Sequence, residues 1–234
     1  MYKQNILIYA SELSSCIGKN PYKDKSEAIK KTYYRNNGQI LREKPLEILE
    51  KIDETLLYQF DNTLNTNQVI NNIENNNRII ETLNLSQDEK IILNDYMKNS
   101  HCTQHGIIQE DKINLNYCRE NNLVIKKDNV FHKKLLYTDD NYNIFLGGKC
   151  DGIIDNTCLV EIKTRMYKLF KEIREYEKIQ VHSYLFIYNI TKAKLIEKYK
   201  DEMMEHEIKF DVDEFDILIK EEMPKFIKIY NEFI

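Results

Sequence analysis

The segment GGKCDGII at residues 147–154, followed after a short turn by CLVEIKT at residues 158–164, decides the fold. Two apolar runs joined by the turn-forming trio Asp-Asn-Thr predict a β-hairpin. A three-residue connection places Asp151 directly across from Glu161. Because side chains alternate between the faces of a strand, Lys163 lies on the same face as Glu161. We therefore expect three charged side chains on one face of this hairpin.

Two carboxylates opposed across a β-ladder repel each other. Apolar residues flank them on both strands, which favours a central, largely buried hairpin over a surface hairpin with solvated charges. Buried carboxylates without a partner are costly. The Lys163 ammonium relieves part of the repulsion, and a divalent cation with oxygen ligands relieves the rest. Asp, Glu and Lys around one metal ion form a site that hydrolyses phosphodiesters.

The composition limits the class of protein. The chain has 234 residues and a formal net charge of −4 at pH 7, which argues against a positively coated surface but not against a nuclease with an acidic metal site. No apolar stretch approaches the roughly 20 residues that span a bilayer, so we expect a soluble, intracellular protein without membrane contacts. Five cysteines without C-x-x-C spacing indicate neither a disulfide framework nor a zinc site. The group His101, Cys102 and His105 lacks matching zinc partners, which favours helix-surface or packing roles.

Hydrophobic periodicity predicts an α/β order of elements. A short helix begun by Ser11 is followed by a helix from near Ser26 to Gly38. Residues 45–100 form Asn-rich helical segments, and the biased composition at 67–78 favours a flexible loop there. We expect further helices at 104–120, 175–189 and 212–233, and strands at 123–126, 130–137, 143–153, 159–164, 193–199 and 207–210.

Four segments together resemble a known group of nucleases. The spacing Asp-x9-Glu-x-Lys, from Asp151 to Lys163, resembles the core of the PD-(D/E)xK nucleases. The segments IYASEL…GKNPY at 8–22, HGIIQE at 105–110 and IQVHSY at 179–184 are similar, in the same order, to motifs of the lambda-exonuclease/YqaJ-type viral recombinase nucleases. The tail, a strand followed by an acidic amphipathic helix, resembles the ending of that family.

This resemblance implies an α/β fold with a restriction-endonuclease-like core, in which helices flank a central mixed β-sheet. We expect a single nuclease domain over residues 1–234, with residues 42–100 as a helical, Asn-rich insertion. The implied partners are double-stranded DNA ends and a single-strand annealing protein, and the family forms ring-shaped homo-oligomers. The Asn, Ile and Lys bias suggests an AT-rich genome, such as that of a large DNA virus or of a parasite. For a viral protein, the host cytoplasm or nucleus is the expected place of action.

The expected metal ligands are oxygen donors on the hairpin and one neighbouring helix. Asp151 and Glu161 are predicted to bind Mg²⁺ or Mn²⁺ directly, and the resemblance adds the Ile162 carbonyl as a third ligand. Glu110 matches the acid of the family's helix and is expected to hold a second metal ion or its water. The alternative for Glu110 is an exposed acid on a helix face.

Two further residues complete the predicted catalytic set. Lys163 is expected to orient or help deprotonate the attacking water and to stabilise charge on the phosphoryl oxygens. Its alternative role is a simple ion pair with Glu161. By resemblance, Gln180 lines the site and positions the substrate phosphate or the nucleophile; its alternative is a packing amide. Tyr184, four residues later, is expected in the core.

DNA phosphates are expected to meet several hydroxyl and basic groups. Ser11 matches the family serine that binds a terminal 5′-phosphate, but the family's arginine seven residues earlier is replaced by Gln4. If the segment after the catalytic strand is a helix, its cations form one basic stripe, although interleaved glutamates equally suit a solvated, salt-bridged face. The predicted phosphate-binding residues are Ser11, Lys19, Arg165, Lys168, Lys171 and Arg174.

Three hypotheses for function follow. The first is a Mg²⁺-dependent deoxyribonuclease that resects one strand of duplex DNA from a 5′ end in recombination or repair. The second is an endonuclease of the same fold that cuts DNA or RNA internally, which the loss of the family arginine favours. The third is a nucleic-acid-binding module without cleavage, and the presence of all the expected acids and the lysine counts against it.

Overall fold

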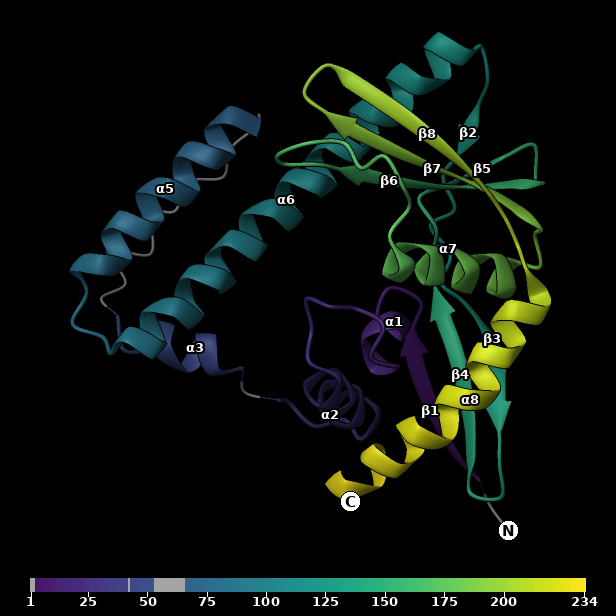
Figure 1. Cartoon of the computed structure of the whole chain (residues 1–234), viewed down its shortest axis with the longest axis horizontal. Helices are drawn as coiled ribbons and strands as arrows, with labels where there is room; N and C mark the ends of the chain where they lie inside the picture. The colour runs from purple at the N-terminus through teal and green to yellow at the C-terminus, as the bar shows by residue number, and fades with distance from the viewer. Residues whose placement is uncertain (1–2, 42, 53–65) are drawn as a thin grey trace.

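The computed structural model describes residues 3–41, 43–52 and 66–234 (Figure 1). In its first half the elements are β1 (Gln4–Tyr9), α1 (Leu13–Cys16), α2 (Lys25–Asn36), α3 (Lys44–Leu49), α5 (Thr66–Thr82) and α6 (Gln87–Asn121). In its second half they are β2 (Ile125–Lys126), β3 (His132–Thr138), β4 (Tyr142–Gly148), β5 (Gly152–Ile154), β6 (Cys158–Thr164), α7 (Glu175–Tyr188), β7 (Lys192–Tyr199), β8 (Glu202–Lys209), α8 (Val212–Tyr230) and the short 3₁₀ helix η1 (Asn231–Phe233).

The first sheet has three strands in the order β1-β4-β3, with β1 parallel and β3 antiparallel to β4. Alternate residues of β1 and β4 point into the core. Ile6 pairs with Ile144 and Ile8 pairs with Leu146, and all four side chains are fully buried. Because β4 runs directly into the segment that carries Asp151, this buried pair of strands fixes where the β5–β6 hairpin begins.

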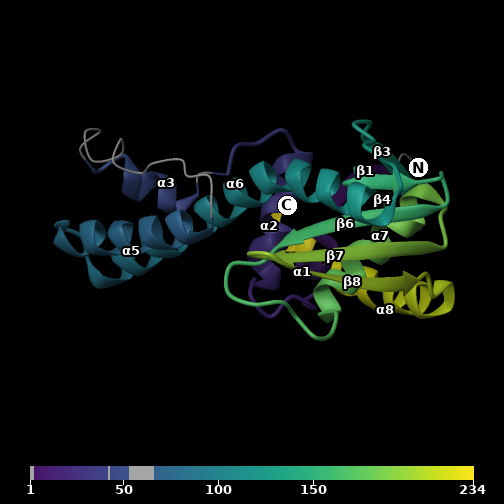
Figure 2. The same ribbon diagram turned by 90° about the horizontal axis from the view of Figure 1, so that it is seen from above.

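The second sheet has five strands in the order β2-β5-β6-β7-β8, with β6 and β7 parallel and the other neighbours antiparallel. Its central strand β6 is buried on both faces. Val160 and Ile162 pack with Ile113 and Tyr117 of α6, which covers one face (Figures 1 and 2). Leu159 belongs to the other face, in the core cluster that α7 shares. The odd-numbered residues of β6, Glu161 and Lys163 among them, therefore point toward α7.

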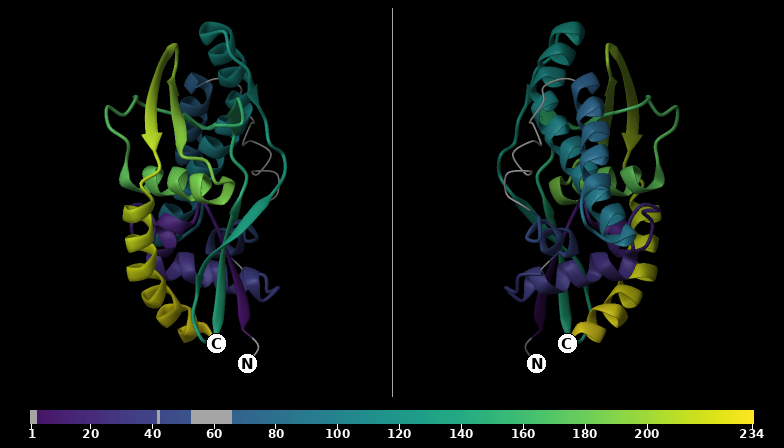
Figure 3. Two further views of the ribbon diagram at one scale, coloured as in Figure 1. Left: turned by 90° about the vertical axis from the view of Figure 1, so that its right-hand side faces the viewer. Right: turned by 90° about the vertical axis from the view of Figure 1, so that its left-hand side faces the viewer.

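Helix α7 packs against strands of both sheets and joins them into one core (Figures 1 and 3). Apolar residues occur on several sides of α7, as expected for a helix buried all round. Ile179, Val181 and Leu185 are buried, together with residues of α1 and α8. The C-terminal end of α8 and the start of β1 lie at the same end of the molecule (Figure 3).

The predicted α/β fold is confirmed, with mixed sheets flanked by helices. The single strand expected at 143–153 is wrong, because these residues form two strands in different sheets: β4 ends at Gly148 and β5 begins at Gly152. An alternating pattern that continues through Lys149–Asp151 does not reveal that the chain passes from one sheet to the other.

The helices α3, α5 and α6 form an arm that extends away from the sheets (Figures 1 and 2). Ile48, Ile80 and Leu93 form a small separate core there. The flexible loop predicted at 67–78 is wrong, because these residues lie in α5. The composition is Asn-rich, but Val69, Ile73 and Ile80 recur on one face and are buried, so tertiary packing outweighs the compositional bias.

The Glu110 helix begins earlier than predicted and has no break at residue 100. Ser86 caps its first turn in a reciprocal capping box with Glu89, so the helix start is clear in the sequence only if that pair is recognised. The helix near residues 26–38 is confirmed as α2, which Asp24 caps and after which Gly38 adopts a positive φ of 65°. The single-domain assignment of residues 1–234 stays a prediction. Within the described ranges, no helix is long and apolar enough to cross a membrane.

Candidate active site

The hairpin turn sets the register that brings the acids together. Asp155 and Asn156 have φ of 49° and 57°, and the Thr157 N–H donates to the Ile154 carbonyl at 3.0 Å. Asn and Asp tolerate this left-handed conformation better than most residues. Gly152 then pairs with Val160, so the next position along the ladder sets Asp151 against residue 161.

Asp151 reaches across to the neighbouring strand. Its Oδ2 accepts the backbone N–H of Ile162 at 2.7 Å. Burial raises the pKa of Asp151 well above its ordinary value, and the charges of Glu161 and Glu110 raise it further, against the effects of the Ile162 hydrogen bond and of Lys163. The protein therefore supplies too little positive charge to stabilise the ionised form of the Asp151 carboxylate.

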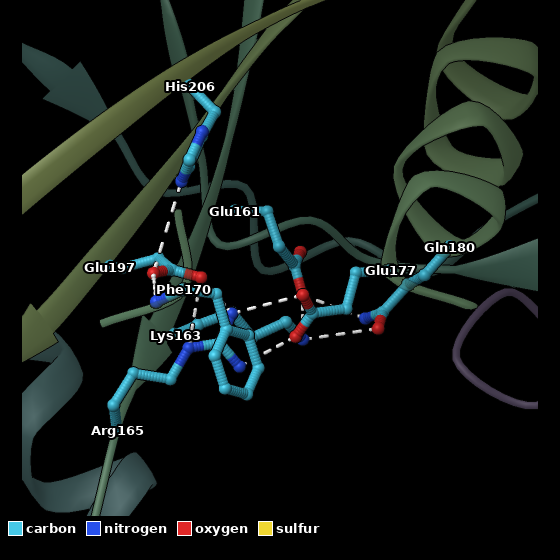
Figure 4. Close-up of polar contacts among 8 residues, drawn as sticks. All are labelled: Glu161, Lys163, Arg165, Phe170, Glu177, Gln180, Glu197 and His206. Carbon is cyan, nitrogen blue, oxygen red and sulfur yellow. Dashed lines mark hydrogen bonds and ion pairs between the residues drawn. The ribbon is translucent and has the colours of Figure 1, made fainter. Parts of the chain in front are cut away.

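Glu161, Lys163 and Gln180 form a closed triangle of contacts (Figure 4). Lys163 Nζ lies 2.8 Å from Glu161 Oε1 and donates to Gln180 Oε1 at 3.1 Å. Gln180 Nε2 donates to the same Glu161 oxygen at 2.7 Å. The amide of Gln180, from α7, therefore bridges two groups of β6 and fixes their relative positions.

The second carboxylate oxygen of Glu161, Oε2, takes no part in the contacts with Lys163 and Gln180. Glu161 is 5% exposed, and its Oε2 has no hydrogen-bond partner among the described residues. A buried, unpartnered carboxylate oxygen is costly unless something binds it. Together with the under-compensated Asp151, this oxygen is the kind of donor that Mg²⁺ or Mn²⁺ takes. The residues on this hairpin fit a divalent cation.

Lys163 keeps its proton in this environment. Burial acts to lower the pKa of Lys163, but the charge and hydrogen bond of Glu161, with Asp151 and Glu177 beyond, outweigh burial and raise it. The ammonium form therefore prevails across the physiological pH range. Such a group stabilises negative charge and holds a proton rather than accepting one.

The buried ring of Tyr184, on α7, packs against Gly148 at the end of β4. A Cβ atom placed on Gly148 would lie 2.9 Å from Tyr184 Cε1, so only glycine lets this ring pack where it does. Burial raises the pKa of Tyr184, and Glu161 raises it further, while a hydrogen bond with Gln180 acts in the opposite direction. Tyr184 is buried as predicted, and it also backs the amide that bridges Glu161 and Lys163.

Glu110 is not gathered with the other two acids. It lies on α6, which covers the other face of β6, and it forms an ion pair with Lys127 at 3.1 Å. Its charge reaches Asp151, as noted above. Across the described residues, no three His, Cys, Asp or Glu side chains are grouped so as to hold a metal ion. Of the four predicted metal ligands, the structure thus brings together Asp151, Glu161 and the backbone of Ile162 only.

The expected anion site at Ser11 does not have the predicted form. The N-cap of α1 is Glu12, and Ser11 is an exposed turn residue before a helix of only four residues. Glu12 itself is paired with Arg35 at 2.7 Å. The helix starts later than predicted because Ser11 lies in a turn in which the Glu12 N–H donates to the Tyr9 carbonyl at 2.8 Å.

The helical basic stripe after β6 is also wrong. Residues 165–174 are not helical, and α7 starts at Glu175. Lys168, Lys171 and Arg174 are exposed on this connecting segment, whereas Lys178 lies on α7 and pairs with Glu214. Helical spacing predicted one face, but these cations are presented by irregular chain instead.

Arg165 is enclosed by carboxylates rather than presented to solvent (Figure 4). Its guanidinium forms a bidentate pair with Glu177 at 2.6 and 3.0 Å and also binds Glu197 through Nε at 3.0 Å and through a second nitrogen. Glu177 and Glu197 are almost fully buried. The other Glu197 oxygen accepts the Phe170 N–H at 2.7 Å. Arg165 thus joins β6, β7 and α7 at the end of the strand that carries Lys163.

A second set of contacts connects α7 to the backbone next to Asp151, and the sequence did not predict it. The Cys150 N–H donates to the Tyr188 hydroxyl at 3.3 Å. Burial raises the pKa of Tyr188, and Asp128 lies close enough to that hydroxyl for its charge to raise the pKa further. Asp128 also binds His132 Nε2 at 2.8 Å. The signal for it is the spacing of four on α7 from Gln180 through Tyr184 to Tyr188, which puts all three side chains on one helix face.

His101 belongs to the arm and not to this site. Its Nε2 lies 2.6 Å from Asn76 Nδ2, and burial lowers its pKa. This agrees with the packing role expected for it and gives no support to a metal cluster with Cys102 and His105.

Comparisons with known proteins give a likeness in fold. No protein-family model and no curated protein matches the chain. Among solved structures, it is similar to LHK-Exo, an alkaline exonuclease from Laribacter hongkongensis, in complex with dAMP, at 10% identity and a TM-score of 0.48 over 97% of this chain and 90% of that one. The solved structures that this chain resembles include exonucleases.

A phage-related exonuclease from Haemophilus somnus 129PT is similar at 14% identity and a TM-score of 0.43, over 56% of this chain and 71% of that one. At such identities and scores, residue roles are not transferred. The chemistry assigned to this chain therefore rests on its own site geometry.

Proposed function

We propose that this protein is a metal-dependent nuclease that hydrolyses phosphodiester bonds in DNA. The observation that carries the proposal is the hairpin site: an under-compensated Asp151, a buried Glu161 with a free oxygen, and the Lys163 ammonium held 2.8 Å from Glu161 by the Gln180 amide. Buried acids that no cation binds destabilise the fold, so a purely structural role does not explain their presence. Two acids and a lysine with this spacing instead fit a site that binds a cation and hydrolyses phosphodiesters.

In this proposal Asp151, Glu161 and the Ile162 carbonyl hold Mg²⁺ or Mn²⁺. When bound, the cation supplies an activated water and stabilises the charge that develops on the phosphoryl group. Lys163 keeps its proton at Nζ, binds an anionic oxygen of the substrate phosphate and orients the attacking water. Gln180 fixes the direction of Lys163, and Glu110, which is paired with Lys127, contributes negative charge that reaches Asp151.

The substrate class comes from the sequence resemblance. We propose a 5′-to-3′ exonuclease on double-stranded DNA ends that acts in recombination or repair inside the cell, alongside a single-strand annealing protein. Internal cleavage is the second candidate. It is favoured by the position of Ser11, which is exposed and does not cap a helix, and by the replacement of the family arginine by Gln4.

Digestion of labelled DNA tests the proposal. Linear duplexes labelled at either end, with and without a 5′-phosphate, are compared with covalently closed circles in Mg²⁺ and in excess chelator. An exonuclease degrades only the linear DNA, whereas an endonuclease also cuts circles. Asp151→Ala is expected to abolish cleavage, and Asp140→Ala, an exposed acid in the β3–β4 turn, is the matched control. Cleavage that persists in chelator or in Asp151→Ala refutes the proposed site.

A further inference from the structure

A polar cavity of about 450 Å³ lies beside the candidate site, between the 18–22 segment and the start of α7. It is separate from the hairpin carboxylates, and the catalytic assignment uses none of its side chains. The residues that matter for its chemistry are Lys19, Pro21, Tyr22, Arg174, Glu175 and Tyr176.

The cavity is one helical turn from the catalytic groups. Tyr176 comes four residues before Gln180 on α7, so the two side chains share a face about 5 to 6 Å apart along the axis. Burial and the charge of Glu177 raise the pKa of Tyr176, while the positive charges of Arg165 and Lys163 act against them. The Lys163 ammonium is therefore within electrostatic reach of the cavity wall.

Two cations line the cavity and one acid offsets them. Lys19 pairs with Glu175 at 3.3 Å on the exposed rim. Arg174 stacks on the Phe170 ring with its guanidinium carbon 4.6 Å from the ring centre. The Arg165 guanidinium carbon also lies 4.1 Å from the Phe170 ring centre, and the Phe170 N–H donates to Glu197. Arg174 has no carboxylate partner in the described part of the chain, so a pre-ordered guanidinium is available to an anion.

An exposed aromatic ring stands next to these cations. Tyr22 is 76% exposed, although it is a large side chain. Its ring meets the Tyr176 ring edge to face, with centroids 5.8 Å apart and planes at 89°. Tyr176 therefore props Tyr22 from one side and leaves ring surface open to solvent. Open aromatic faces beside cations are the features by which proteins hold nucleotides, since every base has a stacking surface.

We propose that this cavity binds the nucleotide next to the phosphodiester that is cut, with its phosphate between Lys19 and Arg174 and its base stacked on Tyr22. The ligand class is a nucleotide within a DNA strand, recognised through phosphate charge and base surface without sequence preference. The assignment rests on the proposed nuclease function, and it adds the subsite that holds the strand for cleavage one helical turn away.

Binding separates this subsite from catalysis. The Asp151→Asn protein is titrated with a short oligonucleotide that carries a fluorophore at its far end, in chelator, and fluorescence anisotropy gives Kd. Tyr22→Leu and Arg174→Gln are each expected to raise Kd about tenfold, within the range measured for loss of one stacked base. Arg174→Lys, which keeps the charge, is expected to recover part of the affinity. Tyr167→Leu is the matched control, because Tyr167 is 60% exposed but outside the cavity lining.

The outcomes distinguish the two proposals. Unchanged Kd in Tyr22→Leu and Arg174→Gln overturns the subsite while leaving the nuclease intact, provided that the wild type cleaves DNA. Equal weakening by Tyr167→Leu also overturns it, because stacking is then not specific to the cavity. Selective weakening in a protein that never cleaves DNA supports the nucleotide site and removes the nuclease assignment.

Discussion

The Tyr188 hydroxyl accepts the backbone N–H of Cys150 at 3.3 Å, one residue before Asp151. The contact links α7, which also supplies Gln180, to the segment that carries the acid. His132, which is paired with Asp128, packs its ring against Tyr188 with the ring centroids 4.7 Å apart. The backbone next to Asp151 is thus tied to α7 through a contact that does not involve the Asp151 side chain.

Tyr188→Phe removes this acceptor and leaves the Cys150 N–H without a partner. We expect the free energy of unfolding to fall by about 1–3 kcal/mol, and kcat to fall on the order of 10- to 100-fold because the acid is misplaced. KM is expected to change little, which steady-state kinetics on a linear duplex checks. Tyr96→Phe in the arm is the control. Equal losses in both variants would mean that Tyr188 acts only through general stability.

Gly148→Ala tests the fit of Tyr184 against β4. The added methyl group lies 2.9 Å from Tyr184 Cε1, so the ring has to move and disturb Gln180. We expect lower thermal stability, by about 1–3 kcal/mol for an overpacked core, together with reduced cleavage. Gly106→Ala is a sharp control, because nothing lies within 4 Å of its new methyl group, and removing glycine from the interior of α6 should stabilise by about 1 kcal/mol. Thermal unfolding that ranks the two variants in the opposite order contradicts the packing described here.

Asp151→Asn is expected to stabilise the metal-free protein at neutral pH while abolishing cleavage. The folded-state pKa of Asp151 is raised by burial and by Glu161, so the folded protein binds this proton more tightly than the unfolded chain does. Its contribution to stability is complete below the unfolded pKa, near 4, and is lost as the pH rises through the folded pKa. The gain from Asp151→Asn should therefore be largest at neutral pH and vanish in acid.

Thermal melts in chelator at several pH values measure this effect. Asp140→Asn, on the surface, should show no such pH-dependent gain. A metal-free Asp151→Asn protein less stable than the wild type at neutral pH contradicts the charge balance assigned to the site.

Gln180→Leu removes the amide that joins Lys163 to Glu161. We expect kcat to fall about 10²-fold, since the Lys163 ammonium loses its fixed direction toward the developing charge. The fold should persist, because leucine fills a similar volume. Gln104→Leu, an exposed glutamine on α6, is the control. Single-turnover cleavage of a linear duplex measures the rate of the chemical step. An unchanged rate would mean that Gln180 has only a packing role.

Arg165→Met leaves two buried carboxylates without their cation. A loss of about 3–5 kcal/mol in the free energy of unfolding is expected, because breaking a buried pair from one side exposes an uncompensated charge. Arg119→Met, at the exposed end of α6, should cost far less. Denaturant unfolding measures the difference. Unchanged stability combined with weaker DNA binding would restore the phosphate-binding role that the sequence suggested for Arg165.

The hairpin was predictable from sequence because its determinants are local. Apolar runs, a three-residue turn and strict alternation fix the register of Asp151 and Glu161 and the common face of Glu161 and Lys163. Gln180, the partner of Glu161 on α7, was predicted from the resemblance of residues 179–184 to the family motif. The wrong expectations concern long-range packing. Whether residues 67–78 are helical depends on the face of α6 that they cover, and composition does not contain that information.

The same limit applies to charges. Helical spacing predicted one basic stripe along residues 168 to 178. Instead, the pairing of Arg165 with Glu177 and the hydrogen bond from the Phe170 N–H to Glu197 hold this segment in an irregular conformation before α7 begins. Glu110 was placed on the correct kind of element, but its pairing with Lys127 depends on how the chain folds back after α6 and β2. The ion-pair partners of long charged side chains depend on the tertiary structure, and the spacing of residues in the sequence does not predict them.

Helix α6 runs unbroken from the arm to the level of Glu110. Between Gln87 and Glu110 it spans about 35 Å at the ordinary helical rise. No glycine–serine pair or proline interrupts that stretch, so it has no hinge at which to bend. The small core of the arm is therefore held at a fixed distance from the β-sheets by one continuous helix.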